Sequence, residues 1–129
     1  MPTGYLGIPG SVVLGIAVLM GVNAAQASGC DPAEGARVYQ KCAACHSLEP
    51  GRHLQGPSLN GLFTREGRPV EGFRYSTAMR DAKIKWNEKS FKRFIENPGR
   101  MVPGTTMPFG GIRSKEQRDH LFCYLREGE

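Results

Sequence analysis

The first 29 residues contain no Lys, Arg, Asp or Glu, and an apolar run extends within them from Ile8 to Val22. An apolar run followed by small residues, here Ala25-Gln26-Ala27, is typical of a secretory signal peptide and its cleavage site. The run is shorter than the ~20 residues that a membrane-spanning helix needs. We expect residues 1–27 to form a signal peptide or membrane-targeting segment and residues 28–129 to form one domain.

Beyond residue 30, apolar positions recur with helical spacing, first in a stretch that opens at Asp31. Asp31 can cap a helix, Pro32 suits its first turn, and Glu34 completes a capping box. Gly35 lies on the apolar face of this helix, where glycine costs stability unless another helix approaches closely. The face is completed by Val38, Tyr39 and Cys42.

Two more amphipathic helices are predicted in the second half of the chain. The first follows Asn87, which can cap it, and ends at Asn97-Pro98. The second follows a capping box that begins at Ser114 and ends near Gly128. Their apolar positions are Phe91, Phe94 and Ile95 in the first, and Leu121, Phe122, Tyr124 and Leu125 in the second.

The remaining segments are rich in glycine and proline and are expected to be loops, including residues 100–111. Thr77 to Ala82 is expected to form one short helix, and no segment has the alternation of a strand. The pattern predicts an all-α fold.

Length and charge narrow the function classes. The chain has 129 residues, enough for one domain. Its net charge is +5, which suits an acidic protein partner or a membrane surface. Nucleic acid is not expected as a partner, because no basic motif interleaved with aromatic residues is present.

The sequence Cys42-Ala43-Ala44-Cys45-His46 carries the clearest chemistry. A redox Cys-x-x-Cys pair would suit a thioredoxin-like βαβ setting, which the pattern does not contain. A zinc site would need two further ligands at a usual spacing, and Cys30 and Cys123 are single and far apart. Cys-x-x-Cys-His indicates instead the attachment of a c-type haem.

The spacing of this motif has a mechanical reason. Two cysteines three positions apart lie on one face of a helix, so both sulfurs can form thioether bonds to the two vinyl groups of one porphyrin. His46 would then lie beneath the ring, where its imidazole can bind the iron. The second axial position could be filled by several side chains: Met79, Met101, Met107, His53 or His120. Met107 stands out because Pro103 and Pro108 stiffen the loop that holds it.

Four separated motifs now resemble one family. CAACH, GPSLNGLF, Trp86 and NPGRMVPGTTMPF, in this order and spacing, are similar to class I cytochrome c, particularly bacterial cytochromes of the c-two type and mitochondrial cytochrome c. The resemblance covers residues 31–127. It implies an all-α shell around one covalent haem, with the N- and C-terminal helices packed together through Gly35 and Tyr39 against Leu121 and Tyr124.

The resemblance also implies roles for individual residues. Cys42 and Cys45 match the thioether cysteines, His46 the proximal ligand and Met107 the distal ligand. Pro57 matches the proline whose carbonyl accepts a hydrogen bond from the proximal imidazole. The other matching residues are Arg65, Tyr75 and Trp86, which surround the haem propionates, and Phe109, which covers the haem edge.

Three positions depart from the family pattern. Phe94 replaces a tyrosine whose hydroxyl can bond the methionine sulfur in many relatives. Gly99 and Thr106 occupy places where relatives carry lysines of a ring around the haem edge. Basic residues remain at Lys41, Arg100, Arg113 and Lys115. Because the lysines at positions 99 and 106 are missing, we expect docking with a redox partner to be weaker in charge or aimed at a different partner.

The function expected from this resemblance is one-electron transfer outside the cytoplasm, without enzymatic activity. The alternative is a haem enzyme such as a peroxidase, or a ligand-binding haem protein, with an open sixth position. The expected protein is a periplasmic monomer. Its expected partners have acidic docking surfaces: a cytochrome bc1-type complex, a terminal oxidase, a photosynthetic reaction centre or a peroxidase.

The N-terminal region permits three fates. Cleavage after Ala27 would release a soluble carrier with Cys30 as a thiol. Ala27-Ser28-Gly29-Cys30 also resembles a lipoprotein cleavage box, although Ala at its first position is atypical, and lipid at Cys30 would tether the domain to the membrane. A retained apolar run is the third fate. Cys123 is expected to be a small buried hydrophobe.

Overall fold

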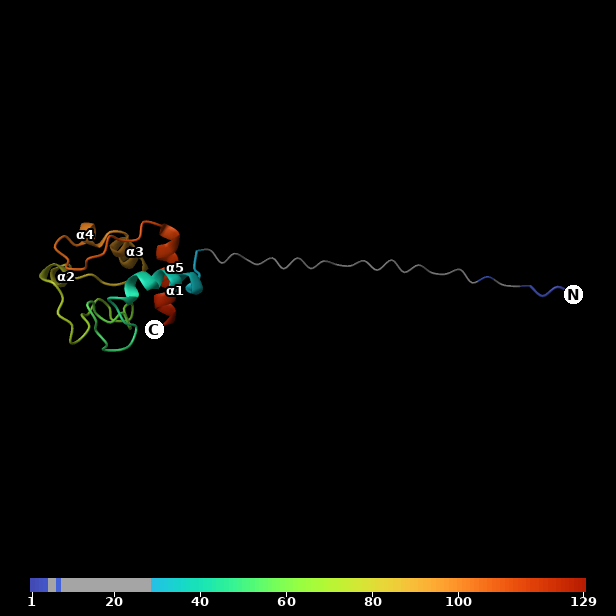
Figure 1. The fold of residues 1–129 in the computed structure, drawn as a ribbon, viewed down its shortest axis with the longest axis horizontal. Helices are drawn as coiled ribbons and strands as arrows, with labels where there is room; N and C mark the ends of the chain where they lie inside the picture. The colour runs from blue at the N-terminus through green and yellow to red at the C-terminus, as the bar shows by residue number, and fades with distance from the viewer. Residues whose placement is uncertain (5–6, 8–28) are drawn as a thin grey trace.

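The computed structural model describes residues 1–4, 7 and 29–129, and helices wrap irregular loops in the part from residue 29 onward (Figure 1). The five helices of this part are α1 Pro32–Ala43, α2 Thr77–Asp81, α3 Glu88–Glu96, α4 Pro98–Met101 and α5 Lys115–Glu127. Within residues 29–129 there is no β-strand, and a single isolated bridge joins His46 to His53. The all-α prediction is confirmed.

The apolar run from Ile8 to Val22 and the cleavage sequence at 25–27 lie outside the described residues. In the described part of the chain, no helix combines the length and the apolar character that crossing a membrane requires.

Helices α1 and α5 cross and pack closely, as the resemblance implies (Figure 1). A Cβ atom added to Gly35 would lie 2.6 Å from the Cβ of Tyr124 and closer still to the carbonyl oxygen of His120. The rings of Tyr39 and Tyr124 pack beside this point, with their centroids 5.6 Å apart. Gly35 is therefore required by the close approach of the two helices.

Helix α3 packs against α5 through buried aromatic and aliphatic side chains. Phe91, Phe94 and Ile95 are all buried. The ring of Phe63, from the loop after α1, meets those of Phe91 and Phe122 edge-on, at centroid distances of 5.3 and 4.9 Å. An aromatic cluster therefore joins two helices, α3 and α5, to the loop after α1.

The start of α1 differs from the predicted capping box. The side chain of Asp31 caps the helix by accepting hydrogen bonds from the backbone N–H groups of Ala33 and Glu34, at 2.9 and 3.2 Å. Glu34 does not return the bond; it pairs with Arg37 on the helix surface. The backbone N–H of Asp31 instead donates to Nδ1 of His120 at 2.9 Å. The predicted box is wrong because α5 supplies the acceptor.

The cap of α5 also lacks the second hydrogen bond of a capping box, whereas the cap of α3 has both. Ser114 accepts from the backbone N–H of Gln117 at 3.2 Å. The side chain of Gln117 accepts from Lys41 of α1 at 3.0 Å, so the predicted box is again only half formed. The reciprocal capping box lies at α3, where Asn87 and Ser90 satisfy each other's backbone N–H groups.

The loop predicted for residues 100–111 begins with an additional short helix. Helix α4 starts at Pro98, and the side chain of Asn97 accepts from the backbone N–H of Arg100 at 3.0 Å. Proline at the first helical position and a preceding asparagine favour this turn. The high proline and glycine content of the segment conceals it in the sequence.

A disulfide bond joins Cys30 to Cys123, with their Cα atoms 5.7 Å apart across a sequence separation of 93. Cys123 is buried, with 4% of its surface exposed, but it is not a free hydrophobe. Cys30 is not a free thiol. Both expectations for these cysteines are wrong because the segment before α1 folds onto α5.

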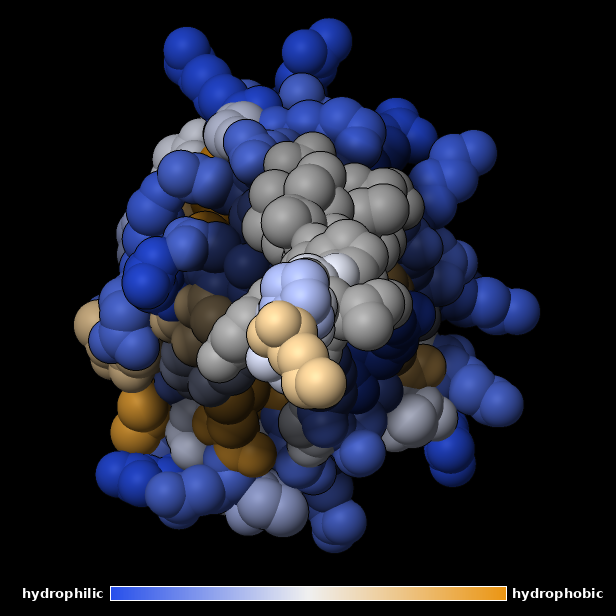
Figure 2. All heavy atoms as spheres, turned by 90° about the vertical axis from the view of Figure 1, so that its right-hand side faces the viewer, coloured by the Kyte–Doolittle hydropathy of each residue, from blue (hydrophilic) through white to orange (hydrophobic). Residues whose placement is uncertain are grey.

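Figure 2 views the molecule from the side where α1 and α5 cross. Polar side chains dominate the visible surface, and hydrophobic atoms appear in small separate patches. Among the described residues, the large hydrophobic side chains that are exposed are Met1 and Leu54.

Candidate haem site

A cavity of about 260 Å³ lies between the end of α1, the loops that follow it, the 105–108 loop, and helices α3 and α5. Eight of the nine predicted site residues line it: Cys42, Cys45, His46, Pro57, Arg65, Tyr75, Trp86 and Met107. Phe109 does not line the cavity; it is half-buried and packs against the core. The fold thus gathers residues more than sixty positions apart around one space.

Cys42 lies in the last turn of α1, and Cys45 lies in the turn that directly follows the helix. The backbone N–H groups of Cys45 and His46 both donate to the carbonyl of Cys42, at 3.0 and 2.9 Å, and so continue the helical turn beyond Ala43. Burial raises the pKa of the Cys42 thiol to about 11. The raised pKa disfavours the thiolate, which is the form of cysteine that binds zinc.

The imidazole of His46 is held from several directions. Its Nδ1 lies 2.8 Å from the carbonyl oxygen of Pro57, and the hydroxyl of Tyr39 donates to its backbone carbonyl at 2.7 Å. Burial lowers the pKa of His46, although the bond to Pro57 opposes this effect. The ring is therefore neutral near pH 7, with Nδ1 occupied and Nε2 left to bind a metal.

Gly56 is a site residue that the sequence reasoning did not single out. A Cβ atom at this position would lie 2.7 Å from Nδ1 and 2.8 Å from Nε2 of His46, so any side chain would displace the imidazole. The backbone N–H of Gly56 also donates to the carbonyl of Cys45 at 2.7 Å. Its place directly before Pro57 is the available signal, but Gly-Pro indicates a turn on its own.

The structure narrows the five candidates for the second axial ligand. Met79 and Met107 line the cavity, and Met101 lines a separate hollow. His53 is engaged through both ring nitrogens, with Ser58 and Glu71. His120 accepts from Asp31 near the first turn of α1. Two thioether sulfurs therefore remain as candidates beside this cavity.

Polar side chains, among them Arg65 and Tyr75, also line the largely apolar cavity. Nη1 of Arg65 is buried and has no hydrogen-bond partner among the described residues, while Nε donates to the carbonyl of Gly61 at 3.2 Å. The hydroxyl of Tyr75 accepts from the backbone N–H of Val70 at 3.2 Å and keeps its own proton to donate. A buried guanidinium donor calls for an anion, so the lining fits an apolar group that bears carboxylates, as haem does.

Trp86 closes the cavity beside Phe94. Its ring meets that of Phe94 edge-on, at a centroid distance of 5.2 Å. Phe94 also lines the cavity, and it has no hydroxyl with which to bond a methionine sulfur. This part of the lining is therefore apolar.

Two thiols on one helical turn, an oriented neutral imidazole and a methionine facing a mostly apolar cavity define an all-α protein of the c-type cytochrome class. Comparison of sequences identifies the family: the family model described as "Cytochrome c" matches residues 32–129. The chain belongs to the cytochrome c family.

Individual relatives agree with this assignment. The chain is 43% identical to cytochrome c2 of Rhodoblastus acidophilus over 98 residues, covering 75% of this chain and 92% of that protein. It is 38% identical to cytochrome c2 of Blastochloris viridis over 117 residues, covering 90% and 91%. It is 36% identical to cytochrome c of Nigella damascena over 104 residues, covering 79% and 94%.

Membership of this family determines the cofactor and the general function. The chain carries one covalently attached c-type haem and is a haem-based electron carrier. The alternative of a peroxidase gains no support from these comparisons.

Proposed function

We propose that this chain is an exported one-electron carrier whose haem is attached through Cys42 and Cys45 and ligated by His46 and Met107. The observation that carries the proposal is the convergence of these four side chains on one cavity. Bound there, haem iron supplies a one-electron couple between Fe(II) and Fe(III). The chain's own task is to hold that group in place, exclude water and limit rearrangement.

On the proximal side, the proposed ligand is His46, whose imidazole is held in a fixed orientation. The Nδ1 contact with Pro57 fixes both the ring orientation and the tautomer and raises the basicity of the other nitrogen. Gly56 lets the backbone lie flat against the ring. The imidazole is thus preorganised and needs no rotation when the oxidation state changes.

On the distal side, Met107 is preferred over Met79 because it lies in the segment NPGRMVPGTTMPF, which resembles the family motif, and in a loop that contains Pro103 and Pro108. The backbone N–H of Met107 donates to Oγ1 of Thr105 at 3.3 Å, and its carbonyl accepts from the backbone N–H of Phe109 at 2.9 Å. Pro108 restricts the backbone on one side. Met79 lies instead on the five-residue helix α2, although both methionines are half-buried against the core.

Two protein ligands would fill both axial positions and leave none for a substrate. Histidine and methionine ligation also raises the reduction potential of haem iron. We therefore propose a carrier and not an enzyme. Arg65, Tyr75 and Trp86 would hold the haem carboxylates, since Arg65 has an unpartnered buried donor, and Phe109 would pack behind the Met107 loop.

The proposed partners are redox proteins with acidic docking surfaces in the periplasm: a cytochrome bc1-type complex, a terminal oxidase, a reaction centre or a peroxidase. Three exposed basic side chains, Arg68, Arg80 and Lys83, line the mouth of the cavity. Four basic residues outside the cavity lining are also exposed: Lys41, Arg100, Arg113 and Lys115. Attraction between these positive charges and an acidic partner accelerates the encounter of the two proteins and weakens as salt concentration rises.

Met107→Ala, with Met79→Ala as the matched control, tests the proposed ligation. Replacing Met107 should produce high-spin or ligand-exchanged iron and lower the potential by part of the ~0.8 V range that axial ligation spans. Met79→Ala removes the other cavity thioether and should leave a low-spin spectrum with a methionine–iron charge-transfer band. Optical spectra and redox titration of the purified holoproteins measure both effects.

The opposite pattern would show that the distal assignment is wrong. If Met79→Ala loses the charge-transfer band and Met107→Ala keeps it, Met79 is the ligand. High-spin iron in the unmodified protein would contradict the carrier proposal itself, because it would indicate an open axial position.

A further inference from the structure

We propose that Cys30 is committed to the disulfide with Cys123 in the mature protein and therefore carries no lipid. The proposal is independent of the electron-transfer function. It concerns the cysteine that follows the lipoprotein-like sequence Ala27-Ser28-Gly29.

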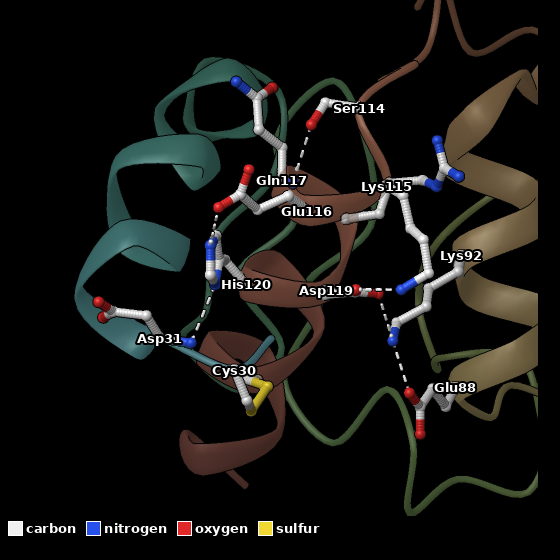
Figure 3. A network of polar contacts seen from close by, with 12 residues as sticks. Cys30, Asp31, Glu88, Lys92, Ser114, Lys115, Glu116, Gln117, Asp119 and His120 are labelled. Carbon is white, nitrogen blue, oxygen red and sulfur yellow. Dashed lines mark hydrogen bonds and ion pairs between the residues drawn. A yellow bond between two sulfur atoms is a disulfide. The ribbon is translucent and has the colours of Figure 1, made fainter. Parts of the chain in front are cut away.

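The disulfide depends on the placement of both cysteines (Figure 3). Cys123 lies on α5, and only 4% of its surface is exposed. The Cα atoms of Cys30 and Cys123 are 5.7 Å apart, within the usual range for disulfides. A sulfur buried on α5 can be reached only by a residue packed directly against that helix, and Cys30 is such a residue.

The residues on both sides of Cys30 are also placed against α5. The backbone N–H of Asp31 donates to Nδ1 of His120 at 2.9 Å. A Cβ atom on Gly29 would lie 3.6 Å from Oδ2 of Asp119. Three consecutive residues therefore meet positions 119, 120 and 123, along little more than one turn of α5. The disulfide therefore links α5 to a segment that also contacts this helix through the residues on both sides of Cys30.

The two fates of Cys30 exclude each other chemically. Lipid attachment forms a thioether at the Cys30 sulfur, and a disulfide uses the same valence. Disulfide formation removes two protons and two electrons from the two thiols. The electrons pass to a disulfide of a thiol–disulfide oxidoreductase, which leaves as a dithiol. The chemistry suits an oxidising compartment outside the cytoplasm.

Lipid at Cys30 would also conflict with the packing. The Cys30 side chain is directed at Cys123 inside the contact between the pre-helix segment and α5 (Figure 3). Acyl chains on that sulfur would require residues 29–31 to leave α5, and the bond between Asp31 and His120 would be lost. The folded domain therefore favours the disulfide over the thioether.

Thiol labelling and intact mass of the holoprotein, produced from the full chain in an exporting host, test the proposal. Under denaturing conditions without reductant, maleimide should label no cysteine, because haem occupies two and the disulfide two. Reduction should add two hydrogens and expose two labelling sites, at Cys30 and Cys123. Digestion without reductant should release the peptides of these cysteines as one linked species.

Variants provide a second readout of the same bond. Cys123→Ser should leave Cys30 as one thiol that labels without reductant. With the iron kept ferrous by ascorbate in every sample, a disulfide reductant should lower the thermal midpoint of the unmodified protein by about 10 °C. The double variant Cys30→Ser with Cys123→Ser should show no such shift.

Three results would overturn the proposal. The first is a Cys30 peptide with the mass of a diacylglyceryl group. The second is labelling of Cys30 in the unmodified protein before reduction. The third is an equal fall in midpoint on adding reductant to the unmodified protein and to the double variant.

Discussion

The packed corner formed by α1, α3 and α5 differs sharply from the haem cradle formed by the loops around the cavity. At the corner, polar groups bind each other: Lys92 and Lys115 both reach Asp119, at 2.7 and 2.6 Å (Figure 3). In the cradle, side chains from several loops converge instead on a mostly apolar cavity of about 260 Å³.

The contrast separates two sources of order in one small domain. The corner is held by contacts within the protein, including the Cys30–Cys123 disulfide and the Gly35 crossing. The cradle consists largely of turns and loops, and its inner faces are shaped for a bound group. We therefore expect substitutions in the cradle to impair haem binding and, through it, the fold, and substitutions at the corner to lower stability while haem is retained.

The largest effect is expected from Cys42→Ala together with Cys45→Ala. This pair should abolish covalent haem and, with it, most of the stable fold. A domain of about a hundred residues has a marginal core of its own, and binding contributes folding free energy. Haem staining on a denaturing gel and circular dichroism measure the two losses.

The matching change at the corner is Cys30→Ser with Cys123→Ser. It also removes two cysteines, but it should retain covalent haem and a cooperative unfolding transition. If the haem-free variant instead kept its full helical content and a sharp transition, the cradle would be self-supporting and the comparison would fail.

A smaller loss is expected when the corner is overpacked. Gly35→Ala should destabilise the protein by about 3 kcal/mol, because the new methyl group meets Tyr124 and the carbonyl of His120. The gain in helix propensity of about 1 kcal/mol offsets part of the clash. Chemical denaturation of the holoprotein measures the difference.

Gly110→Ala is the matched control, since no atom lies within 4 Å of its added Cβ. Its effect should stay within about 0.5 kcal/mol. Equal effects of the two substitutions would show that the close crossing of α1 and α5 does not limit stability.

The smallest of the three effects is expected from Asp119→Asn, at about 2 kcal/mol near neutral pH. Burial alone would raise the pKa of Asp119, but hydrogen bonds and charges from Lys115 and Lys92 outweigh it and lower the pKa. Lys115 is largely exposed, and water screens its share of the interaction.

The sign of the pH dependence follows from that direction. When the pKa of a carboxyl is lowered in the folded state, the carboxylate stabilises the protein at every pH above its pKa in the unfolded chain, which is about 3.9. The stabilisation is lost as pH falls through the lowered folded value. The difference in unfolding free energy between the unmodified protein and Asp119→Asn should therefore shrink in acid. A difference that stays constant with pH would contradict this role for the charge.

The sequence predicts the elements whose causes are local. Periodicity and caps locate α1, α2, α3 and α5, and the haem-binding motif indicates the cofactor. It does not predict contacts that depend on distant segments: the acceptor that His120 offers to Asp31, or the disulfide across 93 positions. Gly56 is missed for the same reason, because its close approach to His46 appears only after the loop folds back.

The predicted site residues also differ in how well the sequence indicates their positions. Eight of the nine reach the cavity, because the motifs that carry them match in order and spacing. Phe109 lies outside its lining, since the chain turns after Pro108 and directs this ring toward the core. Met79 and Met107 both line the cavity, so the geometry alone does not choose between them, and Met107 remains the ligand that the motif predicts.

Helix α1 has Cys30 just before its first turn and Cys42 in its last. At 1.5 Å of rise per residue, the ten steps from Pro32 to Cys42 span roughly 15 Å along the helix axis, and Cys30 precedes Pro32, so Cys30 and Cys42 are too far apart for a disulfide. Four thiols can pair in three ways, and the two crossed pairings both require Cys30 to reach Cys42 or Cys45. The helix therefore acts as a spacer that sorts the cysteines: in the folded domain Cys30 reaches Cys123 but neither cysteine of the haem motif, so a crossed disulfide does not fit this fold.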